Sequence, residues 1–156
     1  MNNARERLLG AMAYLKPTFQ IPSLPADVEL DGVALPVMRP LAGNLCVCYL
    51  VDQGGSYGYV NTLDLEEAGI DADALHVLGC ANLLNHVNGR MRFFHHGAIH
   101  GIQSDPQFTA SLMLIDAIWE QAAKAFLTAA PVVSVPSNQF LLFADSASPA
   151  AVNELR

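Results

Sequence analysis

The apolar residues of this chain occur in short runs that turn residues interrupt, and this pattern constrains the fold more than any single motif does. The longest uninterrupted apolar run covers only residues 45–51. A helix needs roughly 20 apolar residues to cross a bilayer, so no segment is predicted to span a membrane. Hydrophobic residues nevertheless make up 52% of the 156 residues, a composition that excludes a disordered chain. We therefore expect a soluble single domain with a buried core.

The N-terminal part is predicted to hold a helix, a proline-rich connector and a hairpin. The apolar spacing within residues 3–15 is helical, and Pro17 ends that helix because the residue before a proline disfavours the helical conformation. A connector with two further prolines continues to residue 25. Asp31-Gly32 predicts a two-residue hairpin turn, because a type I′ turn needs positive φ at both central positions.

The rest of the chain alternates between strand pairs and helices. Strands are predicted for residues 45–52, 57–62, 91–95, 98–103, 132–135 and 139–144. Helices are predicted for residues 64–69, 71–87, 116–127 and 148–156. Asp64 with Glu67 resembles a capping box, and Asp71 is the expected N-cap of the next helix. Residues 109–114 fit either a strand or a helix, and a strand is favoured.

These elements predict an α+β fold, a single domain with a largely antiparallel sheet packed with helices. Within residues 1–156, the N-terminal helix and connector take residues 1–25, the core residues 26–145, and a C-terminal helix residues 146–156.

Acidic residues are concentrated in one stretch of the chain. Residues 17–89 hold nine carboxylates and one base, Arg39, whereas the rest of the chain has seven bases and six acids. Such a one-sided charge repels nucleic acid and anionic membranes, and it speeds encounter with a basic protein. The expected partner is therefore a protein with a basic surface, not a nucleic acid or a membrane. The expected partner-binding residues are carboxylates and two tyrosines that border them: Asp52, Tyr57, Tyr59, Asp64, Glu66, Glu67, Asp71 and Asp73.

A solvated helix start is the alternative interpretation of the same acidic run. Asp64 and Asp71 also fit as N-caps, and Glu66 and Glu67 lie near the positive end of a helix dipole. Whether the acidic segments converge on one face depends on the fold.

Three histidines, His95, His96 and His100, give the alternative of a small hydrolase or a metal-dependent enzyme. On one strand His96 and His100 would lie about 13 Å apart, too far to bind one ion unless the chain turns at Gly97. The cluster contains no carboxylate and matches no zinc spacing, so no metal or other cofactor is predicted. A hairpin with partly exposed histidines is the favoured interpretation.

Nucleophilic sites are also considered and not favoured. His76 and Cys80 are four residues apart on a predicted helix, the spacing of a thiol next to a base, but no cysteine-enzyme signature surrounds them. Ser137 lacks the Gly-x-Ser-x-Gly elbow, and Gly54-Gly55 lacks the lysine of a phosphate-binding loop. Both are interpreted as turns.

Cysteine usage favours a reducing compartment. Three cysteines, of which Cys46 and Cys48 lie two apart on a predicted strand, do not make a disulfide framework. Glu6 interrupts the basic residues of a possible signal peptide, and Lys16-Pro17 stands where small cleavage-site residues would be. The expected location is the bacterial cytoplasm.

Two segments, “YGYVNTLDLEEAGIDADALHVLGCANLLNH” and “VVSVPSNQFLLFAD”, resemble the YtpQ-like bacterial family, a domain of unknown function. The resemblance covers roughly residues 45–145 and rests on structural motifs. Where that family is expected to carry an Arg-Asp pair after the Pro-Ser, this chain has Asn138 and Gln139.

The resemblance implies an immunity or antitoxin role, because small acidic relatives of such domains neutralise a toxin by binding it. The resulting hypothesis is a non-enzymatic immunity protein that covers the active site of a toxin such as a nuclease. A cytosolic secretion adaptor or chaperone, which would also be acidic, is a further alternative.

Overall fold

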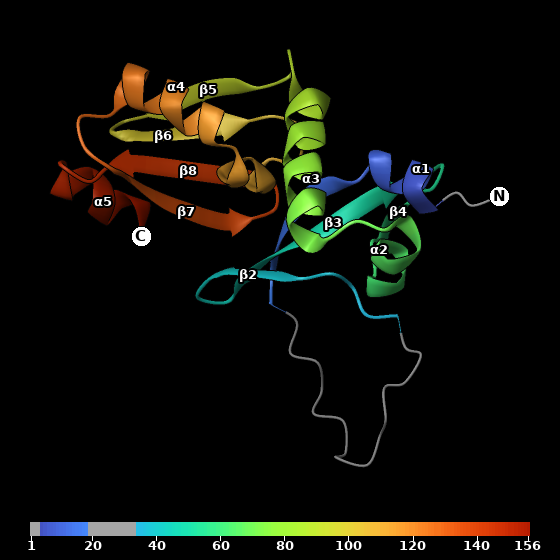
Figure 1. Cartoon of the computed structure of the whole chain (residues 1–156). Helices are drawn as coiled ribbons and strands as arrows, with labels where there is room; N and C mark the ends of the chain where they lie inside the picture. The colour runs from blue at the N-terminus through green and yellow to red at the C-terminus, as the bar shows by residue number, and fades with distance from the viewer. Residues whose placement is uncertain (1–3, 19–33) are drawn as a thin grey trace. The chain divides into compact units, whose positions relative to one another are not determined.

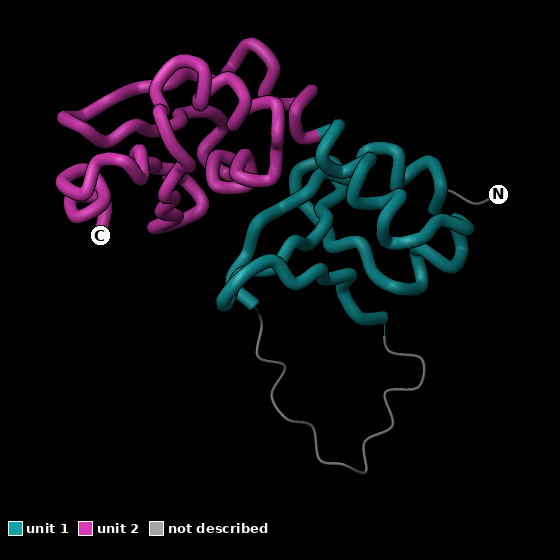
Figure 2. Tube along the Cα trace, turned by 60° about the vertical axis from the view of Figure 1, so that its left-hand side comes forward, with its two compact units in different colours: residues 1–82 teal, residues 83–156 magenta. Residues whose placement is uncertain are grey.

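The protein is described here by a computed structural model that covers residues 4–18 and 34–156. The predicted hairpin turn at Asp31-Gly32 lies outside these residues. The chain forms two compact units, Met1–Asn82 and Leu83–Arg156 (Figure 2). Each unit contains one antiparallel sheet of four strands together with helices, which confirms the predicted α+β class. The described strands thus form two sheets, whereas the sequence predicts one.

Unit 1 consists of a sheet and three helical segments (Figure 1). Its strands are β1 (Met12–Pro17), β2 (Arg39–Ala42), β3 (Leu45–Asp52) and β4 (Tyr57–Tyr59). Its helices are α1 (Ala4–Leu9), α2 (Thr62–Ala68) and the part of α3 (Ala72–Val87) that precedes Leu83.

Strand β3 is the centre of unit 1. It pairs with β1 over Leu45 to Leu50, with β2 near its start and with β4 near its end, and every pairing is antiparallel. Six consecutive residues of β3 are buried, so both faces of the strand are covered. This explains why the longest apolar run of the sequence lies here: a strand buried on both faces has no solvent side on which polar residues could alternate.

The predicted N-terminal helix over residues 3–15 is wrong for its second half. Helix α1 ends at Leu9, and Met12–Pro17 form β1 instead. Antiparallel pairing with residues 45–50 of β3 overrides the helical spacing of this short segment, and Met12, Ala13 and Leu15 are buried along that ladder.

The two helices that follow β4 begin at side-chain caps. Asn61 caps α2: its Oδ1 accepts a hydrogen bond from the Asp64 N–H at 3.0 Å, and the Asp64 carboxylate accepts from the Asn61 N–H at 2.9 Å. The capping box expected from Asp64 and Glu67 is therefore wrong, because the observed box lies three residues earlier, at Asn61 and Asp64. A bridge to Pro36 holds Asn61 in the extended conformation before the helix. The predicted role of Asp71 is confirmed, because its Oδ1 accepts from the Ala74 N–H at 2.7 Å.

Helix α3 packs closely on the sheet of unit 1 through Gly79. A Cβ at this position would lie 3.0 Å from the Ala13 backbone nitrogen and 3.0 Å from Cδ1 of Tyr49. Ala13 and Tyr49 are register partners on β1 and β3. Helix α3 therefore approaches the sheet most closely at Gly79, which has no side chain. Asn82 adds hydrogen bonds from its Nδ2 to the carbonyls of Leu9 and Ala11.

Unit 2 contains the second sheet, in the strand order β5-β6-β8-β7. Its strands are β5 (Arg92–His96), β6 (Ile99–Gln103), β7 (Pro131–Ser137) and β8 (Phe140–Asp145), and all four were predicted to within a few residues. Its other elements are the 3₁₀ segment η1 (Ala110–Leu114), α4 (Asp116–Phe126) and α5 (Pro149–Leu155), which Ser148 caps as expected.

Aromatic side chains join α4 to one face of this sheet. Phe126 stacks on His100 with ring centroids 4.8 Å apart, and Trp119 meets Phe143 edge-on at 5.5 Å. Helix α5 packs against β8 and β6. The strand favoured for residues 109–114 is wrong: the Ala110 N–H donates to the carbonyl of Asn138 outside any ladder, and the segment turns as η1 into α4.

None of the helices in the described part of the chain is long and apolar enough to cross a membrane.

Candidate functional site

Unit 1 contains an apolar groove of about 560 Å³, here called the α2–α3 groove. Its lining residues come from the segment before β2, from β4 and from the starts of two helices: Leu35, Pro36, Val37, Met38, Tyr59, Thr62, Leu65 and Ala72. The Pro36–Asn61 bridge and the hydrogen bond from the Thr62 N–H to the Leu35 carbonyl (3.0 Å) hold the first segment beside α2. The sequence thus builds a hydrophobic depression where several backbone elements meet.

Carboxylates stand beside the lining residues of this groove. Glu66 follows Leu65 and lies one helical turn after Thr62, so it shares the groove side of α2. Asp71 and Asp73 flank Ala72 at the start of α3, and all three carboxylates are exposed. An apolar depression with acidic neighbours complements a partner that presents an apolar side chain among basic residues.

Asp73 differs from the other two because it already has a basic neighbour. Arg39 Nη1 donates to its Oδ1 at 2.6 Å. The Asp73 carboxylate accordingly raises the pKa of Arg39. Asp73 therefore contributes less free negative charge to the groove than Glu66 or Asp71.

Tyr59 lines the α2–α3 groove, but its orientation is fixed by Lys16 of β1. Lys16 Nζ donates a hydrogen bond to the Tyr59 hydroxyl and lies 4.9 Å from the centre of its ring. Tyr59 therefore lines the groove with its ring already positioned and its hydroxyl hydrogen-bonded to Lys16.

Asp64 is the predicted site residue that the structure removes from the candidate surface. It is buried, it completes the capping box of α2, and it forms an ion pair with Arg7 of α1. Both carboxylate oxygens of Asp64 therefore have structural partners, and its ion pair with Arg7 connects α1 to α2.

The other predicted residues do not line the α2–α3 groove. Asp52 and Tyr57 are register partners at the β3–β4 turn, where Asp52 Oδ1 accepts from the Gly54 N–H at 2.7 Å. Glu67 is exposed, but it is two positions beyond Leu65, and residues so spaced on a helix do not share a face. The eight predicted residues thus separate into one that lines the groove (Tyr59), three next to lining residues in the chain (Glu66, Asp71 and Asp73), two at the turn, one buried and one on another side of α2.

Sequence reasoning missed the apolar half of the site. The sequence analysis gives Leu35, Val37, Met38 and Leu65 no role in binding, although all four line the groove. A signal was present, because this apolar run contains Pro36, and a proline inside a strand-like run argues against a central strand.

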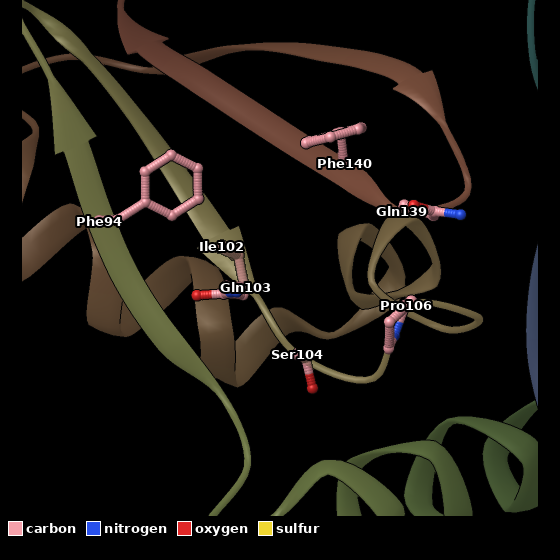
Figure 3. Close-up of a pocket in the computed structure, with 7 residues that line it drawn as sticks. All are labelled: Phe94, Ile102, Gln103, Ser104, Pro106, Gln139 and Phe140. Atoms are coloured by element: carbon pink, nitrogen blue, oxygen red, sulfur yellow. The ribbon is translucent and has the colours of Figure 1, made fainter.

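A second pocket, of about 390 Å³, lies in unit 2. Figure 3 shows Phe94 of β5 and Phe140 of β8 on either side of Ile102 and Gln103 of β6. Both phenylalanines are exposed. Neither pocket has a charged lining residue, but the carboxylate next to this one, Asp105, is already paired with His86 at 2.9 Å. This pocket therefore offers a basic partner less free negative charge than the α2–α3 groove does.

The histidine cluster is divided by the β5–β6 hairpin. His95 and His100 are register partners, whereas His96 pairs with Ile99 and faces the other side. His95 and His96 are exposed, as the favoured interpretation expected. His100 is packed on Phe126 and Phe143, and burial, followed by the charge of His95, lowers its pKa. Within residues 4–18 and 34–156, no group of three or more His, Cys, Asp or Glu side chains is placed to hold a metal ion.

The two turn interpretations are confirmed. Ser137 Oγ accepts a hydrogen bond from the Gln139 N–H at 3.2 Å within the β7–β8 turn. Gly54 and Gly55 have positive φ angles of 77° and 122° in the β3–β4 turn.

Comparison with known proteins adds no further constraint on this site: no protein-family model, curated protein or solved structure matches the chain.

Proposed function

We propose that this chain is a non-enzymatic protein-binding protein of the immunity type, which neutralises a basic bacterial toxin by covering its active site. The α2–α3 groove is the proposed docking surface. The observation that carries the proposal is an apolar groove of about 560 Å³ whose lining residues Leu65 and Ala72 adjoin the exposed carboxylates Glu66 and Asp71 in the chain.

The two components of this surface have different tasks. An apolar side chain of the partner enters the groove and loses its contact with water, which supplies affinity. The carboxylates attract basic residues of the partner and select its orientation, which mainly speeds association. A toxin that holds substrate phosphates in a basic active site, as a nuclease does, offers such residues, and covering them blocks its substrate.

The test begins with affinity capture from the native cell and ends with inhibition of the captured partner. We expect a basic protein whose purified activity falls when this chain is added in equimolar amount. Thr62→Trp places a large ring in the groove at an exposed lining residue, so it should weaken inhibition while the protein stays folded.

A matched variant separates groove filling from a general effect of added bulk. Gln121→Trp puts the same ring on an exposed position of α4 in unit 2, and it should leave inhibition unchanged. If the captured partner keeps full activity in the complex, or if both tryptophan variants inhibit as well as the parent, the proposal is wrong.

A further inference from the structure

His76, Cys80 and Tyr49 form a connected group of side chains in unit 1. His76 and Cys80 are one turn apart on α3, and His76 Nε2 lies 3.7 Å from Cys80 Sγ. The other ring nitrogen, Nδ1, lies 3.0 Å from the hydroxyl of Tyr49 on β3. A ring nitrogen that meets a thiol, with the ring oriented by a third group, is the arrangement from which activated cysteines are built.

Each ring nitrogen of His76 has one neighbour that bears on which nitrogen carries the proton: the Tyr49 hydroxyl at Nδ1 and Cys80 Sγ at Nε2. Tyr49 is buried, and burial raises its pKa to about 12, so the hydroxyl keeps its proton at neutral pH. A buried hydroxyl needs an acceptor, and the structure gives it His76 Nδ1. With Tyr49 donating to Nδ1, the imidazole proton is on Nε2 and points to Cys80 Sγ.

The His76 ring stays neutral in this arrangement. Burial, followed by the charge of Arg39, lowers its pKa. A neutral ring with its proton on Nε2 is a donor to the sulfur, and a donor stabilises a thiolate more than a thiol. His76 thus favours the reactive form of Cys80 without becoming charged.

The other two cysteines have the opposite surroundings. Cys46 and Cys48 are buried in β3, whereas Cys80 is half-buried. Burial, followed by the proximity of Cys46, raises the pKa of Cys48 to about 12. Of the three thiols, Cys80 alone combines partial access to solvent with a ring nitrogen at the sulfur.

We propose that Cys80 is a peroxide-reactive thiol, with His76 as the residue that stabilises its thiolate and Tyr49 as the residue that positions His76. The thiol proton leaves to solvent. The thiolate sulfur then attacks one oxygen of hydrogen peroxide, an S–O bond forms, and the O–O bond breaks. The products are a sulfenic acid on Cys80 and a hydroxide ion that takes a proton from solvent, so the sulfur is oxidised and the peroxide reduced.

The test exposes the folded full chain to dilute hydrogen peroxide, traps sulfenic acid with dimedone and locates the adduct by mass spectrometry of peptides. We expect the adduct on Cys80, with little on Cys46 or Cys48. His76→Phe keeps a ring but removes the donor, and it should slow the reaction at pH 7 about tenfold, the effect of roughly one pKa unit. Tyr49→Phe keeps the buried ring and removes only the hydroxyl, and it should slow the reaction severalfold.

A pH profile separates positioning from a general structural effect. The rate of Cys80 alkylation by iodoacetamide should reach its midpoint at a higher pH in both variants than in the parent. Circular dichroism should show that Tyr49→Phe remains folded, so the test stands even if His76→Phe does not fold. Equal adduct on all three cysteines, or an unchanged profile in folded Tyr49→Phe, would overturn the proposal.

Discussion

At the scale of single residues, the Asp145 carboxylate binds two connecting segments of unit 2. It ends β8 and accepts hydrogen bonds from the Thr128 hydroxyl and from the backbone N–H groups of Thr128, Ala129 and Ala147. These donors belong to the connection before β7 and to the turn before α5. The Thr128 hydroxyl, followed by the backbone donors, lowers the pKa of Asp145 to about 2.

This lowered pKa predicts a loss of stability in acid. The folded state holds the charged carboxylate more strongly than the unfolded state, whose pKa is near 3.8. The stabilisation is therefore complete above about pH 4 and is lost as the pH falls towards 2. Asp145→Asn should lower the free energy of unfolding at pH 7 and flatten its decline between pH 4 and 2, as measured by urea unfolding.

A second carboxylate of unit 2 serves as the control. Glu120 is exposed on α4, so Glu120→Gln should keep the pH dependence of the parent. If Asp145→Asn and the parent decline in parallel from pH 4 to 2, the hydrogen bonds to Asp145 do not favour its charged form.

At the scale of elements, the sequence predicted most strands and helices because their signals are local. Gly97 turns with a φ of 59° between β5 and β6, and Ser148 precedes the proline that starts α5. The failures have a common physical cause, which is pairing with distant residues. Residues 12–17 form a strand because each of them pairs with a residue of β3. Residues 110–114 form η1 where the Ala110 N–H donates a hydrogen bond to the carbonyl of Asn138.

The capping box of α2 gives a prediction for one element. Asn61→Ala removes the acceptor for the Asp64 N–H and should cost about 1 kcal/mol of unfolding free energy. Asn61→Asp keeps an acceptor oxygen at the same position and should lose much less. Chemical denaturation of the three proteins compares them directly, and equal losses in both variants would show that the cap is not the stabilising feature.

The contact of α3 with its sheet gives a second element-scale prediction. Gly79→Val places methyl groups against the Ala13 backbone and the Tyr49 ring, and overpacking of this kind costs about 1–3 kcal/mol. Ala81→Val introduces the same side chain at an exposed position of the same helix, where the cost is about 0.5 kcal/mol of helix propensity. A thermal unfolding midpoint for Gly79→Val no lower than for Ala81→Val would contradict the close approach.

At the scale of the whole molecule, sequence predicted the sign of the charge but not the shape of the surface. The acidic excess is a property of composition, so it is visible without a fold. The α2–α3 groove requires residues 35–38 to lie beside α2, and that depends on the Pro36–Asn61 bridge between residues distant in sequence. The sequence also places Asp64 on the binding surface, because its ion pair with Arg7 of α1 joins residues distant in the chain and is not visible without the fold.

The difference between Glu66 and Glu67 allows the docking surface to be tested with nearly identical variants. Both residues are exposed on α2, adjacent in sequence and equal in charge, so either change to lysine alters the net charge equally. Glu66 lies on the side of Thr62 and Leu65, which line the groove, whereas Glu67 does not. Exposed substitutions change stability by about 0.5 kcal/mol or less, so both proteins should remain folded.

If a basic partner docks in the α2–α3 groove, Glu66→Lys should slow its association severalfold and weaken the dependence of the rate on salt, because a charge at the rim acts mainly on the on-rate. Glu67→Lys should have a clearly smaller effect, arising only from the change in overall charge. Stopped-flow or surface-based kinetics at low and high salt measure both rates. Equal slowing by the two variants would mean that the net charge of the chain attracts the partner without the groove, and unchanged rates in both would place the interface on another part of the protein.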